Sequence, residues 1–153
     1  MNTLSREIAK FRTWAEIRLK EGASGAHIHA DAEWECDYPD WANLYEAIEG
    51  FLRATERRKL SSAELELLLY ALARDNEDER IMETLGQFPD AVIQLAQVAF
   101  GYPDSDARWQ VAVLLGKEGS AKAVALLRRF LTDNTEYVQR RARIALQEAQ
   151  AKQ

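Results

Sequence analysis

The chain has 153 residues, of which 47% are hydrophobic and 29% are charged, and it carries seven Gly, three Pro and a net charge of −5. This length suits one ordinary domain, and the composition excludes collagen-like, low-complexity and wholly disordered proteins. The lone Cys36 cannot form an internal disulfide, the N-terminal twenty residues are rich in charge, and no stretch approaches the roughly 18 uncharged apolar residues of a membrane span. We therefore expect a cytoplasmic protein with no membrane segment.

Apolar residues recur at helical spacing along nearly the whole chain. The first series shares one face of a helix expected over about residues 4–21, and consists of Leu4, Ile8, Phe11 and Ala15. Residues 22–39 are rich in Gly, Ala, Asp and His and predict a loop, after which helical spacing resumes at Trp41. Ser61 and Glu64 have the spacing of a capping box at a helix start. These features predict an all-α protein.

A short pattern recurs with a period of about 30 residues. It begins at Glu77, Ala107 and Val138, which are 30 and 31 positions apart, and it places mostly apolar residues at offsets 4, 7 and 8. Each such helix, named B, is preceded by an A helix, and two A helices contain Ala-Val-x-x-Leu, at residues 91–95 and 123–127. Two helices per unit indicate an α-solenoid, whose stacked repeats share one core.

The stretch 106–119, DARWQVAVLLGKEG, resembles the B helix of a short HEAT repeat, which typically reads Asp-x-x-Val-Arg-x-x-Ala-x-x-Ala-Leu-Gly. The resemblance covers about residues 62–149 and is best over residues 104–149. In the first repeat, Glu77 replaces the apolar first position and Asp78 replaces the arginine.

This resemblance implies a short right-handed α-solenoid of about three HEAT-like two-helix repeats over residues 61–153. Residues 1–60, with the loop 22–39, are then expected to form an N-terminal helical cap on the open end of the array. Short HEAT arrays are largely protein-binding scaffolds, while relatives include phycobilin lyases, bacterial immunity proteins and some DNA-binding proteins. Fold by itself does not choose among these functions.

The negative charge is concentrated in the middle of the chain. Residues 31–106 carry eighteen acidic and six basic side chains, a net charge of −12, whereas residues 120–153 carry +4. An acidic segment repels a phosphate backbone and attracts a basic protein. Charge therefore favours a basic protein as the partner.

The acidic and aromatic segment 33–41 is the first candidate surface for a partner. Its expected contact residues are Glu33, Trp34 and Asp37, because aromatic rings offer rigid contact area and carboxylates attract Lys and Arg. The alternative is that Trp34, Tyr38 and Trp41 anchor the loop in the core, which is the stronger interpretation of those aromatic residues.

The B-helix starts provide the second candidate surface. Trp109 lies at offset 2, away from the apolar stripe, so it is the expected interface anchor unless it packs beneath the cap or a neighbouring A helix. The acidic residues expected to surround it are Asp75, Asp78, Glu79, Asp104 and Asp106.

Other kinds of site have weaker signals. His27 and His29 lie near Cys36, but this spacing does not repeat a zinc motif, so no metal or cofactor is expected. Five arginines raise the alternative of nucleic-acid binding, but a solvated helix face explains them better. They are Arg128, Arg129, Arg140, Arg141 and Arg143. Because no nucleophile elbow or phosphate loop occurs, we expect no enzymatic activity.

The sequence therefore predicts a non-enzymatic protein-binding module. The more specific hypothesis is an immunity protein whose acidic surface covers a basic toxin such as a nuclease. A HEAT-like lyase or small-molecule enzyme, and a nucleic-acid-binding protein, are the alternatives.

Overall fold

A computed structural model of the chain describes residues 2–23, 35 and 37–152. Over these residues the protein is helical and contains no β-strand, which confirms the all-α prediction. The helices in chain order are α1 (Thr3–Ala23), α2 (Trp41–Thr55), α3 (Ser62–Arg74), α4 (Arg80–Leu85), α5 (Pro89–Ala99), α6 (Ser105–Glu118), α7 (Ala121–Leu127) with the 3-10 helix η2 (Arg128–Thr132), and α8 (Glu136–Ala151). None of these helices is both long and apolar enough to cross a membrane.

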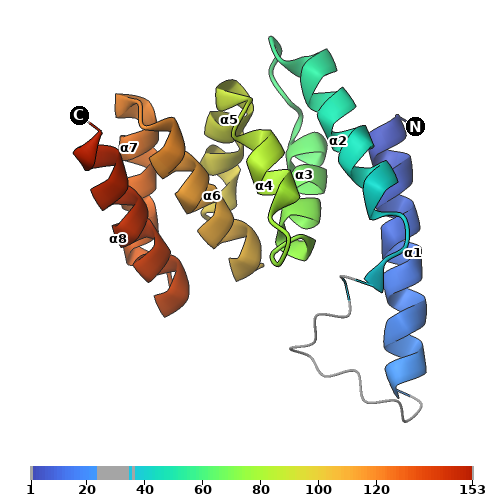
Figure 1. The fold of residues 1–153 in the computed structure, drawn as a ribbon. Coiled ribbons are helices and arrows are strands. Elements are labelled where there is room, and N and C mark those ends of the chain that lie inside the picture. The colour runs from blue at the N-terminus through green and yellow to red at the C-terminus, as the bar shows by residue number, and fades with distance from the viewer. Residues whose placement is uncertain (1, 24–34, 36, 153) are drawn as a thin grey trace.

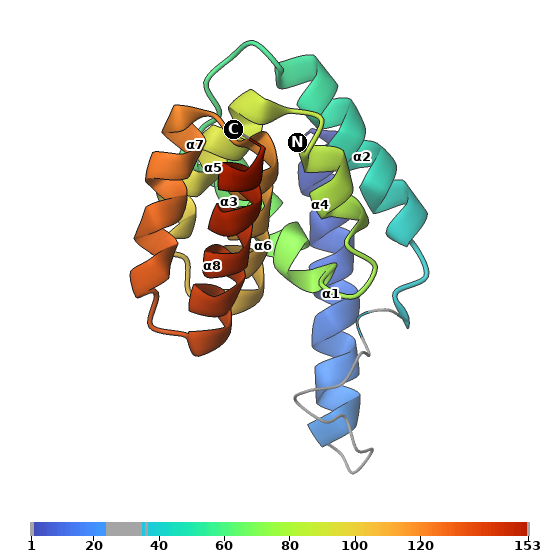
Figure 2. The ribbon, with the colours of Figure 1, turned by 60° about the vertical axis from the view of Figure 1, so that its left-hand side comes forward.

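The helices stack as pairs in the order of the chain (Figures 1 and 2). The A helices α1, α3, α5 and α7 contact one another in sequence, and so do the B helices α2, α4, α6 and α8. The pair α1 and α2, predicted as a cap, therefore continues the same two layers. The A-to-B connections lie at the lower end of the array in Figure 1, and the B-to-A turns lie at its upper end.

Helix starts follow the local sequence closely at α3. The Ser61 Oγ accepts a hydrogen bond from the Glu64 amide at 3.3 Å, and the Glu64 carboxylate accepts one from the Ser61 amide at 2.8 Å. This is the predicted capping box, which satisfies two helix-end amides at once.

The first B helix starts later than its repeat register predicts. The register begins at Glu77, but α4 begins at Arg80, so Glu77 and Asp78 lie in the connection before it and Glu79 is its N-cap. The equivalent residues Ala107 and Val138 are fully buried, whereas Glu77 is exposed. Burying a carboxylate at the first core position would cost free energy, whereas burying an apolar side chain there is favourable. The turn that begins at Glu77 is therefore not helical.

Helix α6 lies at the centre of the array. Residues 107–116 are all buried, because α6 contacts α3, α4, α5, α7 and α8. One of these residues is Arg108, whose side chain is 6% exposed and donates six hydrogen bonds. Two of them reach the Asp133 carboxylate, at 2.8 and 3.1 Å, and two reach the Tyr102 and Pro103 carbonyls. Arg108 thus joins the A-to-B connections of the last two repeats.

Small residues allow α6 and α8 to approach closely. A Cβ atom added at Gly116 would lie 2.7 Å from the Ala145 Cβ and 2.8 Å from the Ala145 carbonyl oxygen. Real Cβ atoms do not approach a backbone that closely, so a larger residue would push the two helices apart.

We expect Gly116→Ala to lower the free energy of unfolding by roughly 1–3 kcal/mol through this overpacking. Gly50→Ala is the matched control, because Gly50 also lies within a helix and its added Cβ meets nothing within 4 Å. The control should be more stable by about 0.5–1 kcal/mol, since alanine suits a helix interior better than glycine. Urea unfolding of both variants measures the difference, and equal effects would contradict the close approach.

Arg108→Met should lower the free energy of unfolding by about 3–5 kcal/mol, because it leaves the buried Asp133 carboxylate without its cation. Arg143→Met is the control, since Arg143 is half exposed and its nearest carboxylate, on Glu136, lies at 3.8 Å. That variant should change stability by less than about 1 kcal/mol. Thermal and urea unfolding of both variants measure the difference. Equal losses of unfolding free energy in the two variants would show that the Arg108 network does not stabilise the fold.

Candidate functional site

The four A-to-B connections form one surface, which we call the loop edge. It consists of Glu35 and residues 37–40, 75–79, 100–104 and 133–135. Most of the acidic residues predicted to contact a partner lie on it or next to it. The structure divides them into two groups: carboxylates bound by neighbouring repeats and carboxylates that face solvent.

Asp75 belongs to the bound group. It is 3% exposed, and its carboxylate accepts hydrogen bonds from the Tyr45 hydroxyl at 2.7 Å and the Ile81 amide at 2.8 Å. Burial raises the pKa of Asp75, although both hydrogen bonds oppose that effect. The prediction that Asp75 forms part of an exposed acidic surround is therefore wrong. Its carboxylate is buried and accepts a hydrogen bond from a backbone amide at the start of α4.

Arg74 joins three connections at the loop edge. Its guanidinium lies 3.3 Å from the Asp104 carboxylate and 3.4 Å from the Glu35 carboxylate. Burial raises the pKa of Glu35 to about 6; Arg74 opposes the rise, while Asp104 and Asp106 add to it. Two carboxylates, on Glu35 and Asp104, thus share one guanidinium, and the nearby Asp106 adds a further negative charge.

Trp109 is buried, with an exposed fraction of 4%. Its indole Nε1–H donates to the Asp106 carboxylate at 3.2 Å, and its ring packs edge-on against Tyr137 and beneath the Arg141 guanidinium. The prediction of an exposed anchor is therefore wrong. The alternative, that Trp109 is buried, is correct. Its packing partner is the B helix α8, however, and not the cap or a neighbouring A helix.

Glu77, Asp78 and Glu79 form the solvent-facing group. Glu77 and Asp78 are exposed and Glu79 is half-buried, and within the described part of the chain no cation forms an ion pair with any of them. The guanidinium of the adjacent Arg80 lies instead over the Tyr45 ring, at 4.3 Å from its centroid. Glu79 has φ of 55°, a left-handed conformation that costs a non-glycine residue about 1 kcal/mol or more.

The aromatic residues of segment 33–41 that the structure describes are core anchors. Tyr38 is 5% exposed and packs with Trp41 against Phe11 of α1. Asp37 is exposed and lies 3.8 Å from Arg18. Glu33 and Trp34, like His27, His29 and Cys36, lie outside the described residues.

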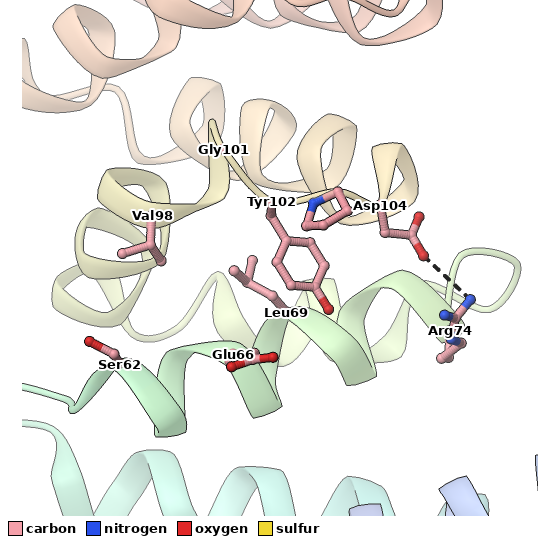
Figure 3. A pocket seen from close by; sticks show the side chains of 9 residues that line it. Ser62, Glu66, Leu69, Arg74, Val98, Gly101, Tyr102 and Asp104 are labelled. Atoms are coloured by element: carbon pink, nitrogen blue, oxygen red, sulfur yellow. Dashed lines mark ion pairs between the residues drawn. The ribbon is translucent and has the colours of Figure 1, made fainter.

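A groove of about 600 Å³ opens beside the loop edge, between α3 and the end of α5 (Figure 3). The Tyr102 ring reaches across it toward α3, above the buried Leu69, and Val98 forms part of its wall. Burial raises the pKa of Tyr102, and Asp104 adds to this effect. The exposed carboxylate of Glu66 lines the groove and has no ion pair with any described cation.

The arginines of the alternative nucleic-acid site largely pack on aromatic rings. Arg129 lies over Phe100, Arg140 over Tyr137, and Arg141 over Trp109, with distances to the ring centroids of 4.8, 5.1 and 4.8 Å. These contacts give the three side chains a structural role. No cluster that could hold a metal occurs among the residues for which positions are described.

Repeat spacing could have identified contacts that the sequence analysis missed. Three hydrogen-bonded or ion-paired contacts join residues exactly one period of 30 positions apart, and these are Tyr45 with Asp75, Arg74 with Asp104, and Asn76 with Asp106. In a stacked array, equivalent positions of neighbouring repeats lie side by side, so the period predicts such pairs. Glu35, Glu66 and Tyr102 carry no comparable signal in the sequence.

The fold and this edge define an all-helical protein of stacked helix pairs that presents its connections along one side. The sequence matches the family model for HEAT repeats over residues 65–147, which is more than half of the chain. The chain therefore belongs to the HEAT-repeat family, whose members are generally non-catalytic scaffolds that mediate protein interactions. No curated protein and no solved structure matches it.

Glu35→Gln should change stability in a pH-dependent way. The folded pKa of Glu35 is about 6 and lies above its ordinary value of 4.5, so the charged form is disfavoured in the folded protein. As pH rises from about 4.5 to 6, the wild type should lose up to about 2 kcal/mol of unfolding free energy that the variant keeps.

Urea unfolding of both proteins between pH 4 and pH 7 measures this difference. Asp37→Asn, two residues away and with a side chain that is 69% exposed, is the control for removing a carboxylate from this segment. A difference between wild type and Glu35→Gln that stays constant across this range would contradict the assignment.

Proposed function

We propose that this HEAT-repeat protein binds a basic protein partner through the loop edge, centred on Glu77, Asp78 and Glu79. The observation that carries the proposal is that no described cation pairs with these three consecutive carboxylates, of which two are exposed and one is half-buried, while the neighbouring Asp75 and Asp104 carboxylates are already bound. A partner that brings Lys or Arg to this connection gains charge pairing without breaking an existing ion pair.

The arrangement of the edge supports the proposal. Asp104 and Asp106 are held by Arg74, Asn76 and Trp109, so their negative charge stays in a fixed position near the free carboxylates. Prearranged charge of one sign steers an oppositely charged protein and mainly raises its association rate. Neither Trp109 nor Asp75 is included in the contact surface, because both are buried.

Neutralisation of a basic toxin, as in an immunity protein, is a specific case of this proposal. Binding at the loop edge would place the body of the HEAT array against the toxin and cover the adjoining surface. The charge of −12 over residues 31–106 supports a basic partner of this kind.

The test combines Asp78→Asn with Glu79→Gln. Partners are captured from an extract of the cells that make the protein, and the association rate of the captured partner is then measured at low and high salt. The double variant should associate roughly 3–10-fold more slowly at low salt, and the difference should shrink at high salt because ions screen exposed charges.

Asp90→Asn with Glu56→Gln is the matched control. It removes the same charge from exposed positions at the B-to-A turns, at the opposite end of the array from the loop edge. Equal slowing by the two pairs would assign the effect to net charge and overturn the proposed surface. Unchanged association of Asp78→Asn with Glu79→Gln would overturn it as well.

A further inference from the structure

The groove between α3 and α5 has the chemistry to receive one long basic side chain. Its apolar part comes from Val98, which is 40% exposed, from the Tyr102 ring, and from Leu69 at the floor (Figure 3). Apolar surface of this kind suits the methylene stem of Lys or Arg, which prefers to lie along apolar groups while its charged end stays near polar atoms.

Charge at the groove favours a cation over an anion. Glu66 and Asp104 line it and Glu35 lies next to it, whereas Arg74 is the lining cation and is already paired with both Asp104 and Glu35. The Arg12 guanidinium on α1 lies outside the groove lining, over the Tyr70 ring at 4.4 Å from its centroid. Its charge opposes the rise in the pKa of Tyr102, as that of Arg74 does, so two cations act at the groove against three carboxylates. Glu66 is thus the lining carboxylate that remains available to a ligand.

We propose that a Lys or Arg side chain of the protein partner enters this groove, with its stem against Val98 and Tyr102 and its charged end beside the Glu66 carboxylate. This inference rests on the proposed function, since it supplies the partner's second contact next to the loop edge. It extends that function to the A-helix side of the array, because α3 and α5 are both A helices.

The pocket also has the form of a recognition site for one residue. Its volume of about 600 Å³ exceeds what one side chain fills, so the partner's neighbouring backbone can lie across the opening. The fixed charge at its Asp104 end and the free carboxylate of Glu66 would hold a cation by charge and a stem by shape.

A hexa-arginine peptide is the probe, and a hexa-glutamate peptide is the control for charge sign. Both are titrated into the full-length, ¹⁵N-labelled protein. Amide shifts of Gly101 and Tyr102 report on the groove, and those of Asp78 and Glu79 report on the loop edge. Hexa-arginine should shift both sets of signals, whereas hexa-glutamate should shift neither.

Two variants test the groove directly. Glu66→Gln should weaken the affinity read at Gly101 and Tyr102 by roughly 3–10-fold, because it removes the available charge partner. Val98→Lys should weaken it by at least about tenfold, since it places a competing cation in the groove at an exposed position and removes no core side chain. Neither variant should change the affinity read at Asp78 and Glu79 by more than about twofold.

Matched controls separate this effect from a change of net charge. Glu83→Gln removes one carboxylate from an exposed site on α4, and Ala125→Lys adds one cation at an exposed site on α7. Both controls should leave the groove affinity within about twofold of wild type, and a larger loss in either would overturn the groove assignment.

The outcomes for the two sites are distinguishable. Hexa-arginine shifts confined to Asp78 and Glu79 would overturn the groove while leaving the loop-edge proposal standing. Shifts at Gly101 and Tyr102 that survive both Glu66→Gln and Val98→Lys would also overturn the groove. Absence of shifts at every one of these amides would count against both proposals.

Discussion

Helix α6 is buried on every side over ten consecutive residues, and the arrangement of the array depends on this constraint. A helix in that position needs apolar or small residues around its whole circumference, which explains why its sequence lacks a single apolar stripe. Arg108 carries the one full charge in this buried stretch. It must be paired with a carboxylate, because an unpaired buried cation is strongly destabilising. Asp133 supplies that carboxylate, so the chain after α7 has to pass beside the start of α6.

The close contact between α6 and α8 follows from the same constraint. Gly116 faces Ala145, and the two backbones approach to a distance that leaves no room for a side chain at residue 116. The last repeat is therefore held by tight packing at one end of α6 and by the Arg108 network at the other. These two contacts fix α8 and the connection before it against α6.

Neighbouring repeats are joined at the loop edge by polar contacts one period apart. Tyr45 with Asp75, and Arg74 with Asp104, each join one repeat to the next through groups that are at least half buried. Together with the contact between Asn76 and Asp106, they bind three of the five carboxylates that the sequence places near the B-helix starts. The late start of α4 leaves Glu77, Asp78 and Glu79 outside this network, so the irregular repeat is also the one with free charge. Among the described residues of the loop edge, Glu77, Asp78 and Glu79 thus form a run of unpaired acids at one connection, beside a groove on the A-helix side, whereas Asp40 is a single unpaired acid at another.

The sequence by itself determined the helical class, the 30-residue period, the capping box at Ser61 and the family, because these depend on local spacing and on residues near one another in the chain. The period also implied which residues of adjacent repeats meet, although not whether they are buried. Only the tertiary structure decided the fates of Trp109 and Asp75, both predicted on the surface and both found inside. Trp109 is buried because α6 has neighbours on all sides, whereas a helical wheel identifies only the face turned toward one partner. Asp75 is buried because its carboxylate accepts hydrogen bonds from the Tyr45 hydroxyl and the Ile81 amide. Similarly, the sequence shows that Glu77 departs from the apolar residue expected at the first position of the repeat. Only the structure shows that α4 begins three residues later, at Arg80.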